Sequence, residues 1–167
     1  SMWGDSYFIT TNSNSPTIWA LDRTSMLAGL PFGFVQKFSL SSFPSIGFQS
    51  ASPITFTGNT LPPPGSPAMM LRVADDAWGS SIDSDHLEMF EAHIDWIDTS
   101  LSSVSGPINL PTPDYNSYMC GFNSLNCIPQ PNTNKKLDPL GNIVMDKVQY
   151  RNFPDHESII CSHVVNA

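Results

Sequence analysis

Three acidic residues stand beside aromatic or imidazole side chains in three well separated parts of the sequence. Glycosidases pair a carboxylic acid with an ionised carboxylate, and aromatic rings stack on the faces of sugars. This pattern predicts a site directed at carbohydrate, either catalytic or purely binding. The candidate catalytic residues are Asp5, Asp95, His156 and Glu157, and the candidate binding residues are Trp3, Tyr7, Trp96 and Arg151.

The same neighbours have a structural interpretation. In an acidic β protein, a carboxylate often caps a turn while the aromatic ring beside it fills the core. We favour this interpretation over catalysis for the individual pairs. Whether the protein is an enzyme therefore stays open at the level of the sequence.

Glu157 begins an expected strand that also contains His163, and His156 lies just before it in the expected hairpin connection. Side chains alternate along a strand, so Glu157 and His163 share a face but lie about 20 Å apart at roughly 3.3 Å per residue. That distance excludes a shared metal ion. His156 and Glu157 remain a hypothetical acid–base pair, and a turn histidine bonded to the backbone is the favoured alternative.

Two acidic loops, Asp75-Asp76 and Asp83-Ser84-Asp85, offer the oxygen ligands that Ca²⁺ prefers. Neither loop matches an EF-hand, because the glycine and the glutamate of that motif are missing. A solvated acidic loop is the favoured interpretation, and we expect no cofactor. Gly-x-Ser-x-Gly and glycine-rich phosphate-binding motifs are absent from the sequence as well.

Three cysteines occur in the sequence. Cys120 and Cys127 bracket a turn-rich spacer that is short enough to close a loop, which predicts a disulfide and an oxidising compartment. The alternative is three reduced thiols in a cytosolic protein. Cys161 lies in an apolar run and is expected to be a small buried hydrophobic residue. Zinc is disfavoured, because no Cys-x-x-Cys or His-x-x-x-His pair occurs.

Short apolar or alternating segments recur between turn signals and predict the strands that must position these residues. The expected strands are 7–11, 17–22, 34–40, 54–57, 69–74, 86–96, 141–152 and 157–165. Residues 86–96 also fit a helical period, but a Ser-rich and Gly-Pro stop that follows favours a strand. Asp22 to Gly29 predicts one short helix, 61–67 an extended connector, and 106–131 an irregular loop.

Frequent short strands between loops rich in Pro, Gly and Ser predict an antiparallel all-β fold with one short helix. Residues 1–167 form either a single β-rich domain or part of a larger β-propeller. Three weakly similar hairpins, each with an acid near an aromatic ring, suit propeller-like blades. A closed propeller needs at least four blades of about 40 residues, so an incomplete propeller is the expected arrangement.

Five motifs stand out along the chain: WGDSYFITTN at 3–12, ALDRTSMLAG at 20–29, PPPGSP at 62–67, CIPQP at 127–131 and YRNFPDHES at 150–158, followed by His163. Together they resemble an uncharacterised family of secreted bacterial proteins. The resemblance implies a β-propeller-like fold and export, and it assigns no activity. Members of that family are usually longer, so this chain looks like a portion of such a protein with open sheet edges.

The 167 residues carry a formal net charge of −8, with 7 Lys+Arg against 15 Asp+Glu. Such a chain lacks the basic surface that nucleic acids or anionic membranes attract, and no run of about 18 apolar residues predicts a membrane span. We expect a secreted or cell-surface module that binds carbohydrate or protein, although the first residues lack signal-peptide features. Its other expected partners are the remainder of the propeller or a second copy. A glycan hydrolase or lyase, and a purely structural segment, are the alternatives.

Overall fold

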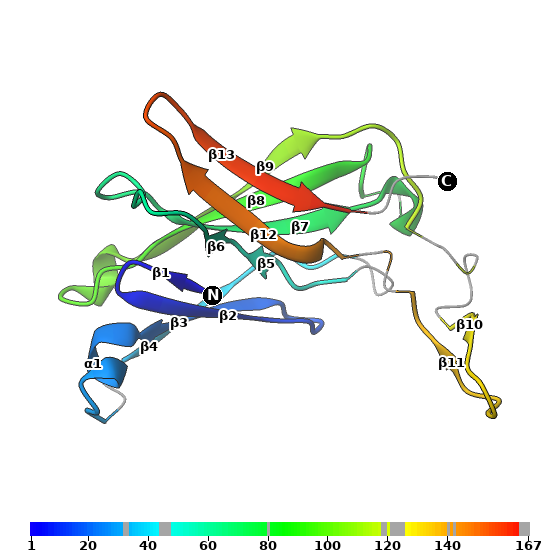
Figure 1. The fold of residues 1–167 in the computed structure, drawn as a ribbon, viewed down its shortest axis with the longest axis horizontal. Coiled ribbons are helices and arrows are strands. Elements are labelled where there is room, and N and C mark those ends of the chain that lie inside the picture. Colours follow the sequence, from blue (N-terminus) through cyan, green and yellow to red (C-terminus); the bar gives the residue numbers. More distant parts are fainter. Residues whose placement is uncertain are drawn as a thin grey trace.

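The computed structural model describes residues 1–31, 34–43, 48–79, 81–117, 120, 126–139, 141 and 143–163. Its strands form three main sheets and a small hairpin arm (Figure 1). The first sheet has four antiparallel strands in sequence order: β1 (Met2–Trp3), β2 (Ser6–Thr11), β3 (Thr17–Asp22) and β4 (Val35–Ser39). The expected strands 7–11, 17–22 and 34–40 are thus confirmed.

Alternation along β2 and β3 gives the first sheet its apolar face. Phe8 pairs with Ala20, and Thr10 pairs with Ile18, so these side chains share one side of the sheet. Phe8, Ile18 and Ala20 are all buried. The predicted short helix follows at α1 (Arg23–Leu27), where the Asp22 carboxylate caps the helix by accepting from the Ser25 amide at 3.1 Å.

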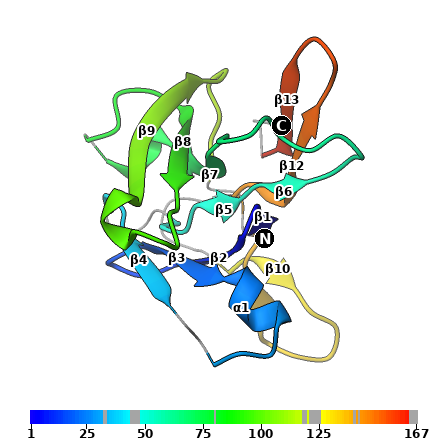
Figure 2. The same cartoon turned by 90° about the vertical axis from the view of Figure 1, so that its left-hand side faces the viewer.

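The second sheet lies over the first in Figures 1 and 2. Its antiparallel strand order is β5-β7-β8-β9. The strands are β5 (Ser52–Pro53), β7 (Ala68–Ala74), β8 (His86–His93) and β9 (Ser103–Pro111). Every residue of β7 is buried, which fits a central strand that is covered on both faces. The predicted strand 86–96 is confirmed over residues 86–93.

Strand β9 corrects the expectation of an irregular loop over 106–131. It is an edge strand that pairs with β8 alone. Its prolines have no amide hydrogen to donate, and an edge strand tolerates this because no second neighbouring strand needs a hydrogen bond from them. The register shifts between Met89 and Glu91, opposite Gly106. Gly106 has a φ of +114°, and a Cβ there would lie 2.7 Å from the Met89 carbonyl oxygen, so this close approach requires glycine.

The third sheet joins distant parts of the chain, in the order β13-β12-β6. Its strands are β6 (Thr55–Phe56), β12 (Met145–Asn152) and β13 (Glu157–Ser162). The β12–β13 hairpin is closed by a hydrogen bond from the Phe153 amide to the His156 carbonyl, and it stands beside the second sheet in Figure 2. Strand β12 runs parallel to β6, which is the exception to an otherwise antiparallel pattern in the described ranges.

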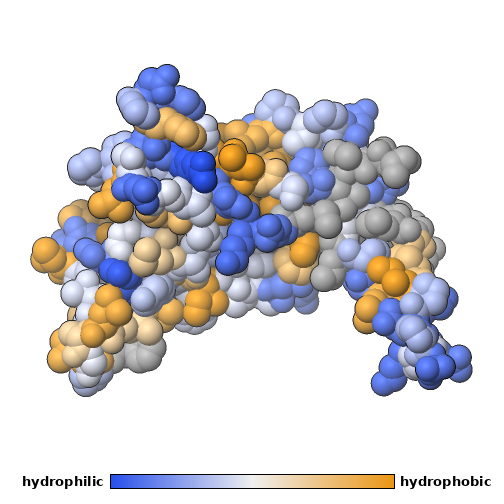
Figure 3. All heavy atoms as spheres, viewed as in Figure 1, coloured by the Kyte–Doolittle hydropathy of each residue, from blue (hydrophilic) through white to orange (hydrophobic). Residues whose placement is uncertain are grey.

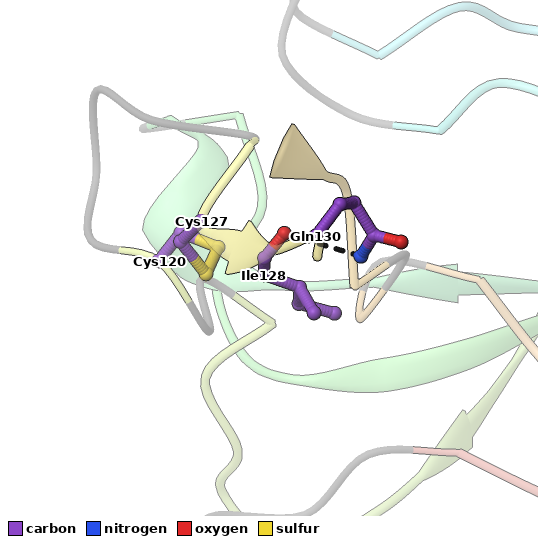
Figure 4. The surroundings of a disulfide bond; sticks show 4 residues. All are labelled: Cys120, Cys127, Ile128 and Gln130. Atoms are coloured by element: carbon purple, nitrogen blue, oxygen red, sulfur yellow. Dashed lines mark hydrogen bonds between the residues drawn. A yellow bond between two sulfur atoms is a disulfide. The ribbon is translucent and has the colours of Figure 1, made fainter. Parts of the chain in front are cut away.

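A small arm, β10 (Ile128–Pro129) paired with β11 (Lys136–Leu137), projects from the body. The predicted Cys120–Cys127 disulfide is confirmed and lies at its base, with a Cα–Cα distance of 5.4 Å (Figure 4). Figure 3 shows hydrophobic residues near the base of this arm and hydrophilic residues at its tip. Cys161 is half-buried, and burial raises the pKa of its thiol.

One core cluster joins the three main sheets and includes Trp3, Phe90 and Tyr150. Two short 3₁₀ turns lie in the connections before and after β8, namely η1 (Asp76–Trp78) between β7 and β8 and η2 (Thr99–Leu101) between β8 and β9. The antiparallel all-β prediction with one short α-helix is confirmed, whereas no closed wheel of blades is seen among the described residues. In those residues, no helix is long and apolar enough to cross a membrane.

Candidate functional site

A cleft lies between the β1–β2 turn and the segment that follows β8. We call it the tryptophan cleft, and its volume is about 460 Å³. It brings together four sequence-predicted residues from positions almost a hundred residues apart, namely Trp3, Asp5, Asp95 and Trp96. His93, Ile97 and Leu101 complete its rim on the β8 side.

A tight turn places Asp5 at the mouth of the tryptophan cleft. Trp3 pairs with Ser6, so Gly4 and Asp5 form the two-residue connection between β1 and β2. Gly4 has a φ of +53°, in the left-handed region that favours glycine in tight turns. The Asp5 side chain is exposed, and its carbonyl oxygen accepts from the Arg23 amide at 3.0 Å, which ties the turn to α1.

Asp95 shapes the opposite wall. Its Oδ1 accepts from the amides of Ile97 and Asp98, both at 2.8 Å, and this closes a turn. Ser102 Oγ accepts from the Asp95 amide at 2.8 Å and fixes the same turn from the other side. One carboxylate oxygen of Asp95 therefore has the turn-capping role that the structural interpretation predicts.

The two tryptophans are held by their indole N–H groups. Trp96 donates to Ser6 Oγ at 3.1 Å, and Trp3 donates to the Ser66 carbonyl at 3.0 Å. Trp3 is only 9% exposed and packs edge-on against Tyr150 at 4.9 Å between ring centres, so it forms a wall. Trp96 is half-buried and offers more ring surface to the cleft.

A second cleft of about 260 Å³ adjoins the first on the other side of the Gly4–Asp5 turn. The two share Trp3, Gly4 and Asp5, and the smaller one adds Arg23 and an apolar wall of Met2, Phe56, Leu61 and Pro62. The Arg23 guanidinium lies 5.9 Å from the centre of the Tyr7 ring. Tyr7 itself lines neither cleft. The two clefts therefore meet at Trp3, Gly4 and Asp5, and the smaller one is the more apolar.

The remaining predicted residues lie on the β12–β13 hairpin and line neither of these clefts. Glu157 accepts from the Tyr150 hydroxyl at 2.7 Å, and desolvation together with this bond raises the pKa of Tyr150 to about 12. His156 Nδ1 lies 2.8 Å from Asp155 Oδ1, with its ring stacked 4.7 Å from Phe153. Arg151 is exposed. The structure therefore separates Glu157, His156 and Arg151 from the cleft that holds Asp5 and Asp95.

The acidic loops come together only in part. Asp75, Asp76 and Asp85 place carboxylate oxygens within 4.8 Å of one another, whereas Asp83 is not in this group. Both oxygens of Asp75 and of Asp85 already accept protein donors, among them the Ser117 and Tyr115 amides. Repulsion from Asp85, the largest cause, raises the pKa of exposed Asp76. These contacts tie the loop to residues 115–117 and leave few lone pairs for a cation.

The sequence predicted the four acid and tryptophan residues of the tryptophan cleft, but it did not predict Arg23, His93, Ile97 or Leu101. Ile97 is 100% exposed and Leu101 is 65% exposed. Nothing in a single sequence distinguishes such residues from core residues. An Arg within the apolar run of β7 was a usable signal for a buried ion pair, and the structure shows one between Arg72 and Glu88.

The fold and the clefts define an all-β, disulfide-bonded protein with an acid- and aromatic-lined depression beside its first turn. Comparisons with protein-family models, curated proteins and solved structures give no significant match.

Proposed function

We propose that this protein is a secreted or cell-surface binding module that recognises carbohydrate through the tryptophan cleft and the smaller cleft beside it. One observation carries the proposal: the fold gathers Trp3, Asp5, Asp95 and Trp96 around one depression. Sugars combine hydroxyl donors with apolar C–H faces, so carboxylate acceptors beside an aromatic ring match their chemistry.

The walls are fixed before any ligand arrives, which favours binding. The indole N–H of Trp96 is bonded to Ser6, and Asp95 closes its own turn, so neither group needs to be ordered by a ligand. Asp5 is exposed at the ridge between the two clefts, where it faces both. A chain of several sugar units lying across this ridge would contact both depressions.

The proposed location outside the cell rests on the disulfide, because such bonds persist in oxidising compartments. The propeller-like arrangement also belongs to the proposal. It is supported by the first sheet, in which four strands follow one another in sequence order as they do in a propeller blade. Completion of the open edges by the remainder of a propeller or by a second copy is part of the same proposal, and a protein ligand is the alternative occupant.

A glycan hydrolase or lyase is the second candidate, because Asp5 and Asp95 line the same cleft. In a glycosidase, one carboxyl group acts as the acid while the other acts as nucleophile or base. Asp95 Oδ1 is engaged by two backbone amides, so Oδ2 is the atom available for such a role. The purely structural alternative predicts neither binding nor turnover.

The test incubates the protein with a panel of soluble and insoluble polysaccharides and records both depletion of the protein and release of reducing ends. Trp96→Ala should weaken binding at least fivefold, because truncating an aromatic anchor costs more than about 1 kcal/mol. Trp96→Phe, which keeps a ring for stacking, should retain most of the binding. Trp19→Ala is the matched control, because Trp19 lies on β3 outside both clefts.

Asp5→Asn separates the two candidates, with Asp155→Asn on the exposed hairpin as its control. Release of reducing ends that disappears in Asp5→Asn while depletion persists would establish the hydrolase. Depletion without release supports the binding module. Binding that is equal in Trp96→Ala and the folded wild type would refute the tryptophan cleft as the carbohydrate site.

A further inference from the structure

A third cleft, of about 410 Å³, opens over the second sheet and shares no residue with the two clefts described above. Glu88 and His86 of β8 line it together with Asn109 of β9, Asp83 and four serines. We call it the Glu88 cleft. Its lining combines a buried carboxylate with a buried imidazole, and neither residue was singled out by the sequence analysis.

Strand pairing sets a polar row beneath this cleft. Glu88 pairs with Arg72 of β7 on one side and with Asn109 of β9 on the other, so the three side chains share one face of the sheet. Arg72 is 1% exposed, and its guanidinium lies 3.9 Å from the centre of the Phe43 ring. Its Nη1 donates to the carbonyls of Ser41 at 2.8 Å and Gln49 at 3.2 Å. Arg72 is therefore a fixed cation behind Glu88 and is not itself a lining residue.

Arg72 orients the Glu88 carboxylate but uses only one of its oxygens. Both Nε, at 2.8 Å, and Nη2 of Arg72 donate to Glu88 Oε2. Glu88 Oε1 makes no hydrogen bond to any residue that the structure describes, although the side chain is only 8% exposed. An oriented carboxylate oxygen of a largely buried side chain is thus left as an acceptor in a residue that lines the cleft.

His86 supplies a second acceptor. Its Nδ1 lies 2.6 Å from the Ser84 carbonyl oxygen, which can only accept, so Nδ1 carries the proton. In the neutral ring, Nε2 is then the bare nitrogen, and it has no hydrogen bond within the described part of the chain. Asp83 adds an exposed carboxylate to the lining. Across the described ranges, no Lys or Arg lines this cleft.

We propose that the Glu88 cleft binds a small organic cation that carries several N–H donors, such as a primary ammonium or a guanidinium group. Glu88 Oε1 and His86 Nε2 are acceptors, and the Asp83 carboxylate lies in the same lining, so a matching ligand must carry several donors. Because no Lys or Arg of the described ranges lines the cleft, a positively charged ligand is favoured. A metal ion fits less well. In the part of the chain that the structure describes, the carboxylate and imidazole groups close enough to share a metal are Asp75, Asp76 and Asp85, elsewhere in the fold. The cation can be a free amine or the side chain of a lysine in a peptide.

The experiment titrates the full chain with n-butylammonium, n-butylguanidinium and the uncharged analogue 1-pentanol, and follows the amide signals of the cleft by NMR. Saturable shifts at Glu88 and at the Asn109 side chain are expected with the two cations and not with 1-pentanol. N-acetyl-lysine methylamide and its Nε-acetylated form make the second arm. Binding of this lysine compound that exceeds binding of the free amine assigns the peptide source, and the reverse assigns a free metabolite. Equal shifts with 1-pentanol would overturn the proposal.

Paired variants separate the acceptor atoms from the fold. His86→Asn keeps a donor that can reach the Ser84 carbonyl but removes the Nε2 acceptor, so the affinity should fall about tenfold, as for the loss of one charge-assisted hydrogen bond. His86→Gln, which places an amide oxygen near the position of Nε2, should retain more of the affinity. Asp83→Asn should weaken binding, whereas Asp114→Asn, outside the cleft, should leave it unchanged. Unaltered affinity in both His86→Asn and Asp83→Asn would refute the site.

Discussion

Replacing Glu88 by leucine should destabilise the protein far more than replacing Glu88 and Arg72 together. The single change leaves the Arg72 guanidinium buried without its counter-ion and with only the neutral groups of Ser41 and Gln49 as partners. Burial already lowers the pKa of Arg72, and the charge of Glu88 opposes that effect. Removing Glu88 therefore exposes the full cost of a buried cation.

The magnitude follows from the burial of the pair. Arg72 and Glu88 side chains are 1% and 8% exposed, so water cannot readily replace the lost partner. Breaking such a pair costs about 3–5 kcal/mol. In a protein of this size, each kcal/mol corresponds to about 2–4 °C in Tm, so Glu88→Leu should lower Tm by roughly 6–20 °C. Urea unfolding followed by tryptophan fluorescence measures the free energy, and a thermal scan measures Tm.

The double variant Arg72→Met with Glu88→Leu is the control. Apolar side chains of similar size in place of a buried pair are often neutral or stabilising, so its free energy of unfolding should lie within about 1 kcal/mol of the wild type. Arg72→Met alone completes the double-mutant cycle. The reasoning is wrong if Glu88→Leu costs less than about 1 kcal/mol, or if the two single costs simply add in the double variant.

Further predictions concern the thiols, an alkaline transition and the acidic loop. Denatured but unreduced protein should take up one alkylating group, at Cys161, because Cys120 and Cys127 are joined; intact mass showing three would contradict the pairing. Reduction should lower the free energy of unfolding by about 2–3 kcal/mol, since the bond closes a short loop in the unfolded chain. The pKa of Tyr150 is raised to about 12 from its ordinary value of 10.0, so the folded state holds this proton more tightly. The stability that the Tyr150 proton contributes is complete below about pH 10 and is lost as the pH rises through 12. Tyr150→Phe should therefore flatten the decline of Tm between these pH values. An unchanged slope would argue against this role of Tyr150. Repulsion raises the pKa of Asp76, so Asp76→Asn should raise Tm at neutral pH. At about pH 3 the substitution should have no effect on Tm, because residue 76 is then uncharged in the wild type as it is in the variant. A loss of stability at neutral pH would refute the repulsion.

Local patterns were sufficient to predict those strands whose side chains alternate between core and solvent. The β2–β3 hairpin and β8 have this alternation, and the helix start at Asp22 has its capping residue. Strand β9 was missed because Gly106 and Pro107 resemble a loop. Its extended form depends on the β8 partner and on its edge position, which are tertiary facts. The parallel bridge between β6 and β12 is likewise invisible locally.

The candidate site was predictable as residue types and not as geometry. Acid and aromatic neighbours indicated Asp5, Asp95 and Trp96, but the same rule also selected Glu157, which the fold places on another hairpin. Only the packing of the first sheet beside the end of β8 decides which acids meet. The signal at Arg72 was overlooked because period-2 patterns treat a charged residue in an apolar run as an interruption rather than as half of an ion pair.

The contact between Trp3 and Tyr150 has a consequence for synthesis on the ribosome. Trp3 packs on Tyr150, Thr57 donates from both its amide and its hydroxyl to the Tyr150 carbonyl, and β12 docks against β6. These contacts span more than ninety residues, so Trp3 and β6 lack these partners until residues 145–152 have left the exit tunnel. Such long-range closure slows folding and prolongs exposure of apolar surface to other nascent chains. A chaperone acting on this protein would therefore find its substrate around Trp3 and β6 during the translation of the last third of the sequence.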